Sequence, residues 1–247
     1  MDFESATLAV VNYRYSSWSF RGWAPLKLAN LEMKEVSLLM EDPNFNIEKF
    51  KYSPTGLFPT IKLTFKDGSE VYIHDSLSVA EFANEYSLEK NKKSLWPQYF
   101  ADRAVARSAA CEMHSGFSQI RTYCNSNFVR HREFEDRFCP DEVKVDLKRI
   151  YELWNSCRKQ FLQTRNSATL GESAQGNVKD EGFLFGEYGI VDAFFTPVVF
   201  RIVNYSLPCE DEFAKKYIEA TKNHSLVKEW LKLAVEENSY IKHYEEF

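Results

Sequence analysis

The segment from Ser53 to Ser78 constrains the fold more than any other part of the chain. Pro59 has no N–H and cannot donate to a sheet, so it belongs at the first residue of a strand or on a sheet edge. An Asp67-Gly68 pair separates the strand-like runs Thr60–Phe65 and Glu70–His74, which is typical of a β-hairpin. The segment therefore predicts two antiparallel strands that lead directly into a helix.

Two interpretations of the hairpin's ends remain open from the residues alone. Asp75 and Ser76 would meet the free N–H groups and the positive end of the following helix. Such residues usually act as plain caps, and Ser78-Val79-Ala80-Glu81 is itself a capping-box pattern that would begin the helix two residues later. Alternatively, a cis Phe58–Pro59 bond would turn the Phe58 N–H and C=O outward, free to pair with an extended peptide.

Composition excludes several classes of protein. The 247 residues, 44% hydrophobic and 27% charged, suit a globular protein of one large or two ordinary domains. The formal net charge of -5 argues against a dedicated nucleic-acid binder, and no apolar run suggests a membrane span. The acidic first residues lack a signal-peptide pattern. Five scattered cysteines, none in a Cys-x-x-Cys pair, favour a reduced cytoplasmic protein without a disulfide framework or metal site.

Strands and helices alternate in the N-terminal part of the chain. Their order is predicted as βαβαββα, a mixed sheet covered by helices. Besides the hairpin, the predicted elements are a strand at Leu8–Val11, a helix from Trp18 to about Leu31, a strand at Val36–Met40, a short helix or turn at Asn46–Tyr52 and a helix from Leu77 to about Tyr86. Pro25 should kink the first helix or end it early.

The remainder of the chain has a helical pattern throughout. The charged stretch Leu88–Ser94 is predicted as a linker, which gives domains at residues 1–88 and 98–247 joined by residues 89–97. The polar residues 166–182 are predicted as an exposed loop. Helices are expected at Ala101–Ile120, Val143–Thr164, Val191–Tyr205, Glu212–Thr221 and Leu226–Glu236.

This organisation resembles the glutathione S-transferase superfamily over essentially the whole chain: an α/β thioredoxin-like domain followed by an all-α domain. The run Tyr15–Arg21 is similar to the serine motif of Ser-type members, zeta-like or of a related bacterial or fungal class. The run Ser53–Pro59 is similar to the family's Asn-Pro-x-Gly-Lys-Val-Pro, and Asp75-Ser76 matches its acidic-Ser clamp. Phe183–Gly186 followed by Asp192 resembles the buried start of the family's central helix, a folding motif rather than a site.

The resemblance implies roles for these residues. Counted back from Arg21, Ser16 is the catalytic hydroxyl, with Ser17 as the alternative and a plain helix cap as the third possibility. Its O–H would stabilise the glutathione thiolate and lower the pKa of the thiol. The Phe58 backbone beside Pro59 would pair with the cysteinyl unit. The pair Asp75 and Ser76 would hold the γ-glutamyl amine and carboxylate.

The chain departs from the family at Leu57, where a lysine usually meets the glycyl carboxylate. The resemblance leaves Lys62 or Lys66 as the substitute. The second substrate is expected to be a small hydrophobic electrophile in a pocket lined by Trp18, Met113, His114 and Phe117. Two of these predicted pocket residues, Met113 and Phe117, are four positions apart and would share a helix face. Such a pair is also typical of a hydrophobic core. Arg121 and Tyr123 are further candidates, for an acidic substrate.

The expected activity is conjugation of reduced glutathione to small electrophiles, a detoxification reaction that needs no metal. The alternatives are a glutathione-dependent cis-trans isomerase similar to maleylacetoacetate isomerase and a non-catalytic binding or assembly module of the same fold. The resemblance also implies a cytoplasmic homodimer that binds neither nucleic acid nor membrane.

Overall fold

The structure, a computed structural model, describes residues 2–167 and 179–246. Contacts divide the chain into two compact units. The first unit takes the residues up to Leu95 together with Asn127–Val129 and the residues from Glu229 onward, and the second takes Trp96–Ser126 and Arg130–Lys228. The first unit thus combines three stretches that lie far apart in the sequence. Residues 168–178 of the predicted polar loop lie outside the described residues, and the domain boundaries stay a prediction.

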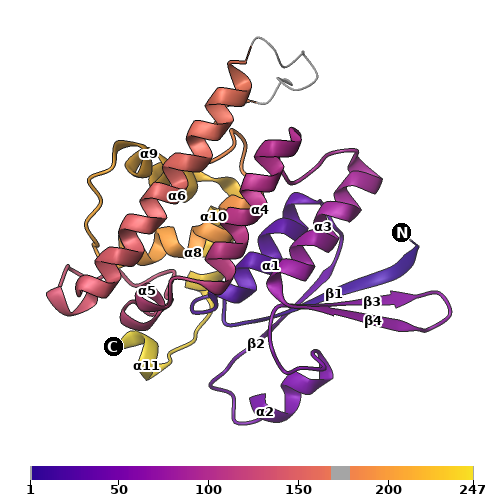
Figure 1. Cartoon of the computed structure of the whole chain (residues 1–247). Coiled ribbons are helices and arrows are strands. Elements are labelled where there is room, and N and C mark those ends of the chain that lie inside the picture. Colours follow the sequence, from indigo (N-terminus) through magenta and orange to yellow (C-terminus); the bar gives the residue numbers. More distant parts are fainter. Residues whose placement is uncertain (1, 168–178, 247) are drawn as a thin grey trace. The chain divides into compact units, whose positions relative to one another are not determined.

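A four-stranded mixed sheet forms the centre of the first unit (Figure 1). The strand order is β2-β1-β3-β4; β1 pairs parallel with β2 and antiparallel with β3, which pairs antiparallel with β4. The strands are β1 (Phe3–Val11), β2 (Lys34–Leu38), β3 (Thr60–Phe65) and β4 (Glu70–His74). The predicted mixed sheet is confirmed, and the hairpin strands have the predicted bounds.

Helices α1 (Ser17–Leu28), α2 (Phe45–Glu48) and α3 (Ser76–Asn91), with the short 3-10 helix η1 (Lys49–Lys51), complete the predicted βαβαββα order. Phe20 and Trp23 of α1 are fully buried, as are Leu8 and Val10 of the central strand β1. Helix α1 continues three residues past Pro25 and ends at Leu28, short of the predicted Leu31; the Ala29 N–H donates to the Pro25 carbonyl at 2.9 Å.

The start of α3 corrects one prediction. The helix begins at Ser76, with Asp75 as its N-cap, and not at the Ser78 capping box. The Asp75 carboxylate accepts a hydrogen bond from the Leu77 N–H at 2.8 Å. Because that bond already satisfies one of the free N–H groups of the first turn, the helix starts two residues earlier than the Ser78 pattern indicated.

The second unit is all-helical in its described residues, as predicted. Nearly every residue of α8 (Ile190–Asn204) is buried, so this helix is the centre of the core. The other helices are α4 (Phe100–Ser115), α5 (Ser118–Tyr123), the 3-10 helix η2 (Asp136–Phe138), α6 (Asp141–Arg165) and α9 (Glu212–Asn223). Helix α10 (Ser225–Glu236) runs across the boundary between the units, and α11 (Lys242–Glu245) belongs to the first.

The predicted single helix from Ala101 to Ile120 is wrong. Helix α4 ends at Ser115, Gly116 is extended, and Phe117 has a left-handed backbone with φ 57 before α5 begins. A Cβ at Gly116 would lie 2.7 Å from the Glu112 carbonyl oxygen, so only glycine fits the break without a shift. Phe117 therefore does not share a helix face with Met113.

Candidate functional site

The hairpin register brings the predicted binding residues together at one end of the sheet. Thr60, the first residue of β3, pairs with His74, the last residue of β4. In an antiparallel pair, the residues just beyond such a couple face each other. Pro59 therefore lies opposite Asp75, at the place where the chain leaves the sheet for α3.

The backbone at Phe58 is open on its polar side. The Phe58–Pro59 peptide bond is cis, and no hydrogen bond among the described residues uses the Phe58 N–H or C=O. The preceding turn is held by buried hydroxyl groups: Ser53 Oγ donates to the Leu57 carbonyl at 2.8 Å, and Thr60 Oγ1 lies 3.0 Å from the same oxygen. A rigid turn thus presents an unused donor and an unused acceptor, as a peptide-binding edge requires.

Asp75 and Ser76 form the second part of the candidate site. Asp75 is exposed and has φ 72 and ψ 133, a backbone conformation that costs a residue with a side chain on the order of 1–3 kcal/mol. Ser76 is 1% exposed, and its hydroxyl makes no hydrogen bond with any of the described residues. A buried hydroxyl without a partner costs free energy, so both residues keep features that capping alone does not require.

Ser16 occupies the start of α1. It is the N-cap of the helix, and its Oγ accepts a hydrogen bond from the Ser19 N–H at 3.1 Å. Ser19 Oγ in turn accepts from the Val11 N–H at 3.0 Å, which ties the helix to the end of β1. Because the Ser16 bond uses the oxygen as acceptor, the hydroxyl proton is available to a ligand. Capping and thiolate stabilisation are thus compatible at Ser16, and Ser17 is the first helical residue.

Gly22 connects the start of α1 with the other parts of the site, and the sequence did not single it out. A Cβ at this position would lie 2.4 Å from Pro59 Cγ and 3.4 Å from Val79 Cγ1 of α3. The backbone of α1 therefore lies directly against the proline ring and near α3. A glycine in the middle of a predicted helix was the available signal.

Leu57, which replaces the family's lysine, is 71% exposed. The two lysines predicted to take over its role, Lys62 and Lys66, differ in their contacts. Lys62 Nζ pairs with Glu70 at 2.7 Å, and this bond raises the pKa of Lys62; no contact of Lys66 places it near Leu57. Lys49 was missed: its Cε would lie 3.3 Å from a Cβ at Gly56, next to Leu57. Its Nζ lies 3.0 Å from Asn46 Oδ1.

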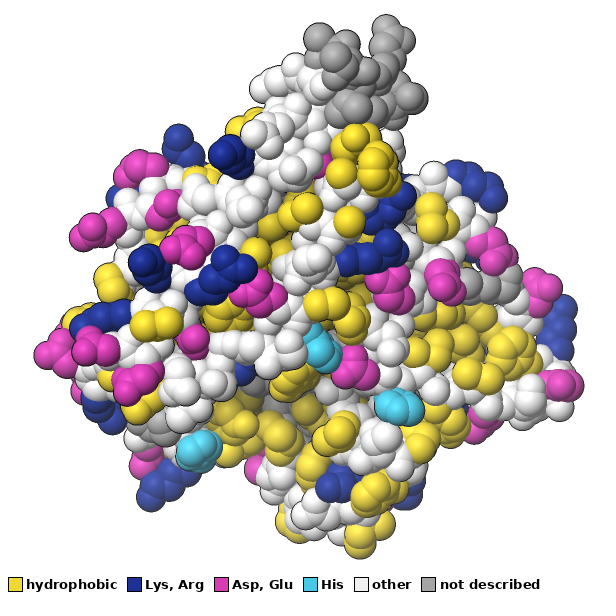
Figure 2. All heavy atoms as spheres, viewed as in Figure 1, with side chains coloured by type: hydrophobic (Ala, Val, Ile, Leu, Met, Phe, Trp, Pro, Cys, Tyr) yellow, Lys and Arg dark blue, Asp and Glu magenta, His cyan; other side chains and the backbone are white. Residues whose placement is uncertain are grey.

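The surface around this lysine is partly apolar. Ile47 and Phe50 are exposed on the same α2–η1 segment, and Leu57 is exposed in the turn that follows it. Figure 2 shows hydrophobic side chains mixed with basic ones over the α2 region. This segment offers a cation in an apolar setting, where a charge interaction with a ligand is stronger than in open water.

The four predicted pocket residues are divided between the units, so the acceptor pocket stays a prediction. Trp18 is partly exposed in the first unit, and the Arg21 guanidinium carbon lies 4.9 Å from its ring centroid. In the second unit Met113 is fully buried and Phe117 nearly so, which suits a core role. The His114 ring lies 6.1 Å from that of Phe194.

Arg121 has a structural role at the end of α4. It donates to the carbonyls of Met113 and Gly116, two groups that the helix leaves without partners. Burial lowers the pKa of Arg121. Arg121 thus acts as a helix cap, and contact of Arg121 or of Tyr123, the last residue of α5, with an acidic substrate stays a prediction.

Asp192 is a folding residue, as predicted. It is fully buried in the first turn of α8 and accepts hydrogen bonds from the N–H groups of Gly189 at 2.9 Å and Leu184 at 3.2 Å. Burial raises the pKa of Asp192 to about 7, while these two donors act in the opposite direction.

Across residues 2–167 and 179–246, no cluster of His, Cys, Asp and Glu is arranged to hold a metal ion. The five cysteines are all free. None of the helices in the described part of the chain is long and apolar enough to cross a membrane.

Comparison with known proteins identifies the fold. No protein-family model and no curated protein matches the sequence. Among solved structures, a Burkholderia glutathione transferase homolog with bound glutathione is 16% identical, with 94% of this chain and 98% of that chain covered and a TM-score of 0.60. A maleylacetoacetate isomerase from Anaeromyxobacter dehalogenans, also with bound glutathione, is 14% identical, with 97% and 100% covered and a TM-score of 0.55. The yeast prion protein Ure2p in complex with glutathione is 12% identical, with 94% and 96% covered and a TM-score of 0.61. The chain therefore has the glutathione transferase fold, with a thioredoxin-like N-terminal domain.

Proposed function

We propose that the protein is a glutathione transferase that joins reduced glutathione to small electrophiles. The Phe58 backbone holds the cysteinyl unit through its N–H and C=O. Asp75 and Ser76 hold the γ-glutamyl amine and carboxylate, the Ser76 hydroxyl turning toward the ligand as it binds. The Ser16 hydroxyl donates a hydrogen bond to the glutathione sulfur.

The chemistry of the proposed step is stabilisation of a thiolate. A free thiol has a pKa of roughly 8.5 and is mostly protonated at neutral pH. One directed O–H donor at the positive end of α1 favours the ionised sulfur, which then attacks the electrophile. A serine hydroxyl is far too weak a base to remove the proton itself, so Ser16 acts as a donor and the proton passes to solvent.

One observation carries the proposal: the unused Phe58 backbone groups adjoin Pro59 at the end of the sheet where Asp75 leads into α3. Asp75 has a strained backbone, and the buried Ser76 hydroxyl has no hydrogen-bond partner among the described residues. A protein that bound nothing here would gain nothing from a strained backbone and an unpaired buried hydroxyl. The three solved structures with bound glutathione add support from the shared fold.

Retention on glutathione-agarose together with an aryl halide conjugation assay tests the proposal. We expect the wild-type protein to be retained and active, and Ser16→Ala to be retained with kcat lowered about 10²-fold, the typical loss for one donor to a developing anion. Ser19→Ala is the matched control, because Ser19 bonds the β1 backbone. Ser16→Ala at the full wild-type rate excludes Ser16 as the donor.

Two other functions are separated by the same assays. Retention without conjugation points to a binding module of this fold. An isomerase is the other candidate because of the similar maleylacetoacetate isomerase. An acidic isomerase substrate needs cations, and Arg121 already caps α4. Conversion of a cis-dienoate by the wild-type protein would favour the isomerase.

Lys49 is our candidate for the cation that meets the glycyl carboxylate. It is the lysine that packs against the turn before Leu57. We expect Lys49→Gln to raise the KM for glutathione about fivefold and to leave the KM for glutathione ethyl ester, whose glycyl carboxylate is blocked, unchanged. Lys51→Gln is the control, because Lys51 Nζ pairs with Glu48 at 2.6 Å on the same segment. Equal effects of Lys49→Gln on both thiols would exclude the assignment.

A cytoplasmic location and a homodimer complete the proposal. The free cysteines are compatible with a reducing compartment. Light scattering of the purified protein measures the oligomeric state directly, and a monomeric mass contradicts the dimer.

A further inference from the structure

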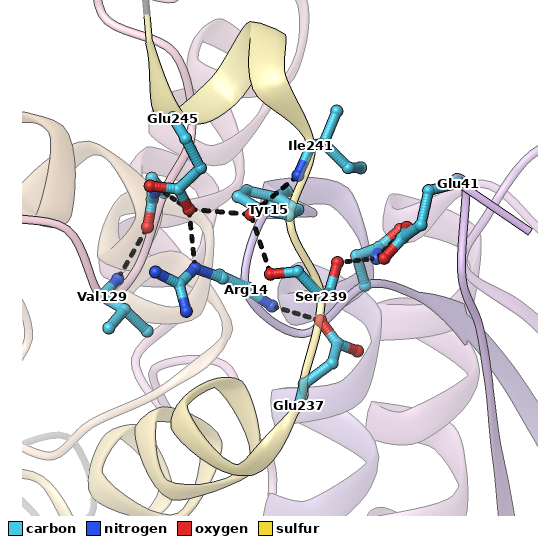
Figure 3. A network of polar contacts seen from close by, with 10 residues as sticks. Arg14, Tyr15, Glu41, Val129, Glu237, Ser239, Ile241 and Glu245 are labelled. Carbon is cyan, nitrogen blue, oxygen red and sulfur yellow. Dashed lines mark hydrogen bonds and ion pairs between the residues drawn. The ribbon is translucent and has the colours of Figure 1, made fainter.

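The end of the described chain lies against the loop that leads into α1, and nothing in the proposed function explains this contact. The loop Asn12–Ser16 joins β1 to the first residue of α1. Four residues beyond α10 contact it: Glu237, Ser239, Ile241 and Glu245, here called the C-terminal clamp (Figure 3). All these contacts lie within the first unit.

The C-terminal clamp supplies the acceptor for two of the four backbone N–H groups from Tyr13 to Ser16. The N–H groups of Tyr15 and Ser16 donate to the Asn12 carbonyl, at 3.0 and 2.9 Å. Those of Tyr13 and Arg14 donate to the two carboxylate oxygens of Glu237, at 3.0 and 3.2 Å. Because each of these N–H groups has a defined acceptor, the path of the loop is fixed up to the Ser16 nitrogen.

Glu245 is the buried centre of the clamp. Its side chain is 3% exposed, and one carboxylate oxygen accepts from the Tyr15 hydroxyl at 2.7 Å, from Arg14 Nε at 2.8 Å and from Asn127 Nδ2 at 3.1 Å. The Tyr15 ring also stacks on Tyr244, with ring centroids 5.0 Å apart. In Figure 3 the Tyr15 hydroxyl points at Glu245 from the residue directly before Ser16.

Several bonds converge on the same tyrosine. The Ile241 N–H donates to the Tyr15 oxygen at 3.2 Å, and the Ser239 carbonyl lies 3.2 Å from it. Burial, and then the bond to Glu245, raises the pKa of Tyr15 to about 12, so the phenol stays protonated as a donor at neutral pH. The charged groups on the tyrosine are Glu245 and Arg14, which pair with each other.

Asn12 joins the clamp to the far end of the loop. Its backbone has φ 22, and its buried side chain donates to Ser239 Oγ at 2.9 Å and to Glu41 Oε2 at 3.0 Å. The Met40 N–H donates to the Asn12 side-chain oxygen at 2.9 Å. A strained residue that is held by two side chains and a backbone N–H indicates a loop whose conformation the fold over-determines.

We propose that the C-terminal clamp positions Ser16: Glu245, through Tyr15, and Glu237, through the loop N–H groups, hold the Ser16 hydroxyl where the bound sulfur lies. This inference rests on the proposed role of Ser16 as the donor. The clamp residues are positioning residues, because they act on Ser16 through the loop.

The physical reason is the short range of a hydrogen bond. A donor weakens steeply when its distance or angle departs from the optimum, and an error of about 1 Å in a catalytic group can cost about 10²-fold in rate. Tyr15 and Ser16 share one peptide unit, so a change in the position of the tyrosine moves the serine. The Phe58, Asp75 and Ser76 contacts do not involve this loop, so glutathione affinity should change little.

The test uses the full chain and two matched pairs of variants. Tyr15→Phe and Glu245→Gln each weaken the buried Tyr15–Glu245 bond with little change of shape. Tyr240→Phe and Glu246→Gln remove an exposed bond of the same type in the same segment, Tyr240 Oη to Glu246 Oε1 at 2.6 Å. Each variant is measured for hydrogen exchange, for the pKa of the bound glutathione thiol by thiolate absorbance, and for kcat and KM.

We expect both buried-bond variants to exchange the amides of the Asn12–Ser16 loop about tenfold faster than wild type. We also expect them to raise the bound thiol's pKa by about one unit, to lower kcat about tenfold and to change the KM for glutathione less than twofold. The exposed-bond variants should match wild type in all of these. In the Tyr15→Phe/Glu245→Gln double variant, the kcat loss should be smaller than the product of the two single losses, because both substitutions act on the same contact.

Each other outcome has a defined meaning. A fall in melting temperature with an unchanged thiol pKa and unchanged loop exchange makes the clamp purely structural and overturns the inference. A wild-type protein that binds no glutathione contradicts the proposed function instead, and the loop exchange rates alone then decide whether the clamp holds the loop. Variants that do not fold are replaced by Glu237→Gln, which must give the same faster loop exchange.

Discussion

Asp75 is the N-cap of α3 and Asp192 lies in the first turn of α8, and their two carboxylates lie in opposite surroundings. Asp75, before α3, is exposed and sits on a backbone with φ 72. Asp192, in the first turn of α8, is fully buried and holds two backbone N–H groups. The same residue type near a helix start thus serves as a candidate ligand group in one unit and as a folding element in the other.

The difference follows from what the folded protein would lose if each carboxylate were removed. A buried acceptor that satisfies buried donors leaves them unpaired when it is deleted, whereas water replaces an exposed acceptor. Binding residues are therefore expected where removal is cheap for the fold and costly for a ligand.

The largest effect should separate the two aspartates directly. We expect Asp192→Ala to lower the unfolding free energy by about 3 kcal/mol, because the Gly189 and Leu184 N–H groups lose their buried acceptor. We expect Asp75→Gly to change stability by less than about 0.5 kcal/mol, since glycine tolerates the positive φ and is an acceptable N-cap, while glutathione retention is lost. Urea unfolding measures both, and equal costs would erase the distinction.

A substitution at Gly22 tests whether the candidate site depends on close packing, as the start of α8 does. Glycine to alanine in a helix interior normally gains about 1 kcal/mol. At Gly22 the added carbon would lie 2.4 Å from the Pro59 ring, so we expect a net loss of roughly 2 kcal/mol and weaker glutathione binding. Gly68→Ala, whose Cβ meets nothing within 4 Å, reports the conformational cost alone. A more stable Gly22→Ala variant would contradict the packing.

The pH dependence of stability should differ between wild type and Asp192→Asn. The pKa of Asp192 is raised from 3.8 to about 7, so its protonated form favours the folded state. Its contribution is full below pH ~4 and is lost as pH rises to about 7, at up to about 1.4 kcal/mol per pH unit, with no further change above. Asp192→Asn lacks this slope. Parallel curves from urea unfolding at pH 4.5 to 8 would show that the carboxylate ionises normally.

The smallest contrast concerns two serines of the site. We expect Ser16→Ala to lose about 1 kcal/mol of stability, because the Ser19 N–H loses its cap. Ser76→Ala should gain up to about 1 kcal/mol, since it removes a buried hydroxyl without a partner, and should weaken glutathione binding. Calorimetric melting with and without glutathione measures both terms. Loss of stability in Ser76→Ala would mean that the hydroxyl has a structural partner.

Local patterns explain which predictions succeeded. The Asp67-Gly68 turn and the alternating runs around it fix β3 and β4, so the hairpin bounds agree with the sequence. The Ser78 capping box failed because a competing cap, Asp75, acts first. The long helix failed at Gly116, where the close approach of the Glu112 carbonyl ends α4. Both failures come from local competition that a pattern leaves undecided.

The sequence by itself determined the order of elements, the hairpin and the identity of Ser16, Phe58, Pro59, Asp75 and Ser76 as candidates, because these depend on neighbours along the chain. Only the tertiary structure decided that Gly22 lies on Pro59, that Lys49 approaches the turn before Leu57, and that Glu237 and Glu245 hold the loop before Ser16. These contacts join residues up to 231 positions apart. Hydrogen bonds and packing act over a few ångströms in space, so residues that are distant in sequence become partners only when the chain has folded.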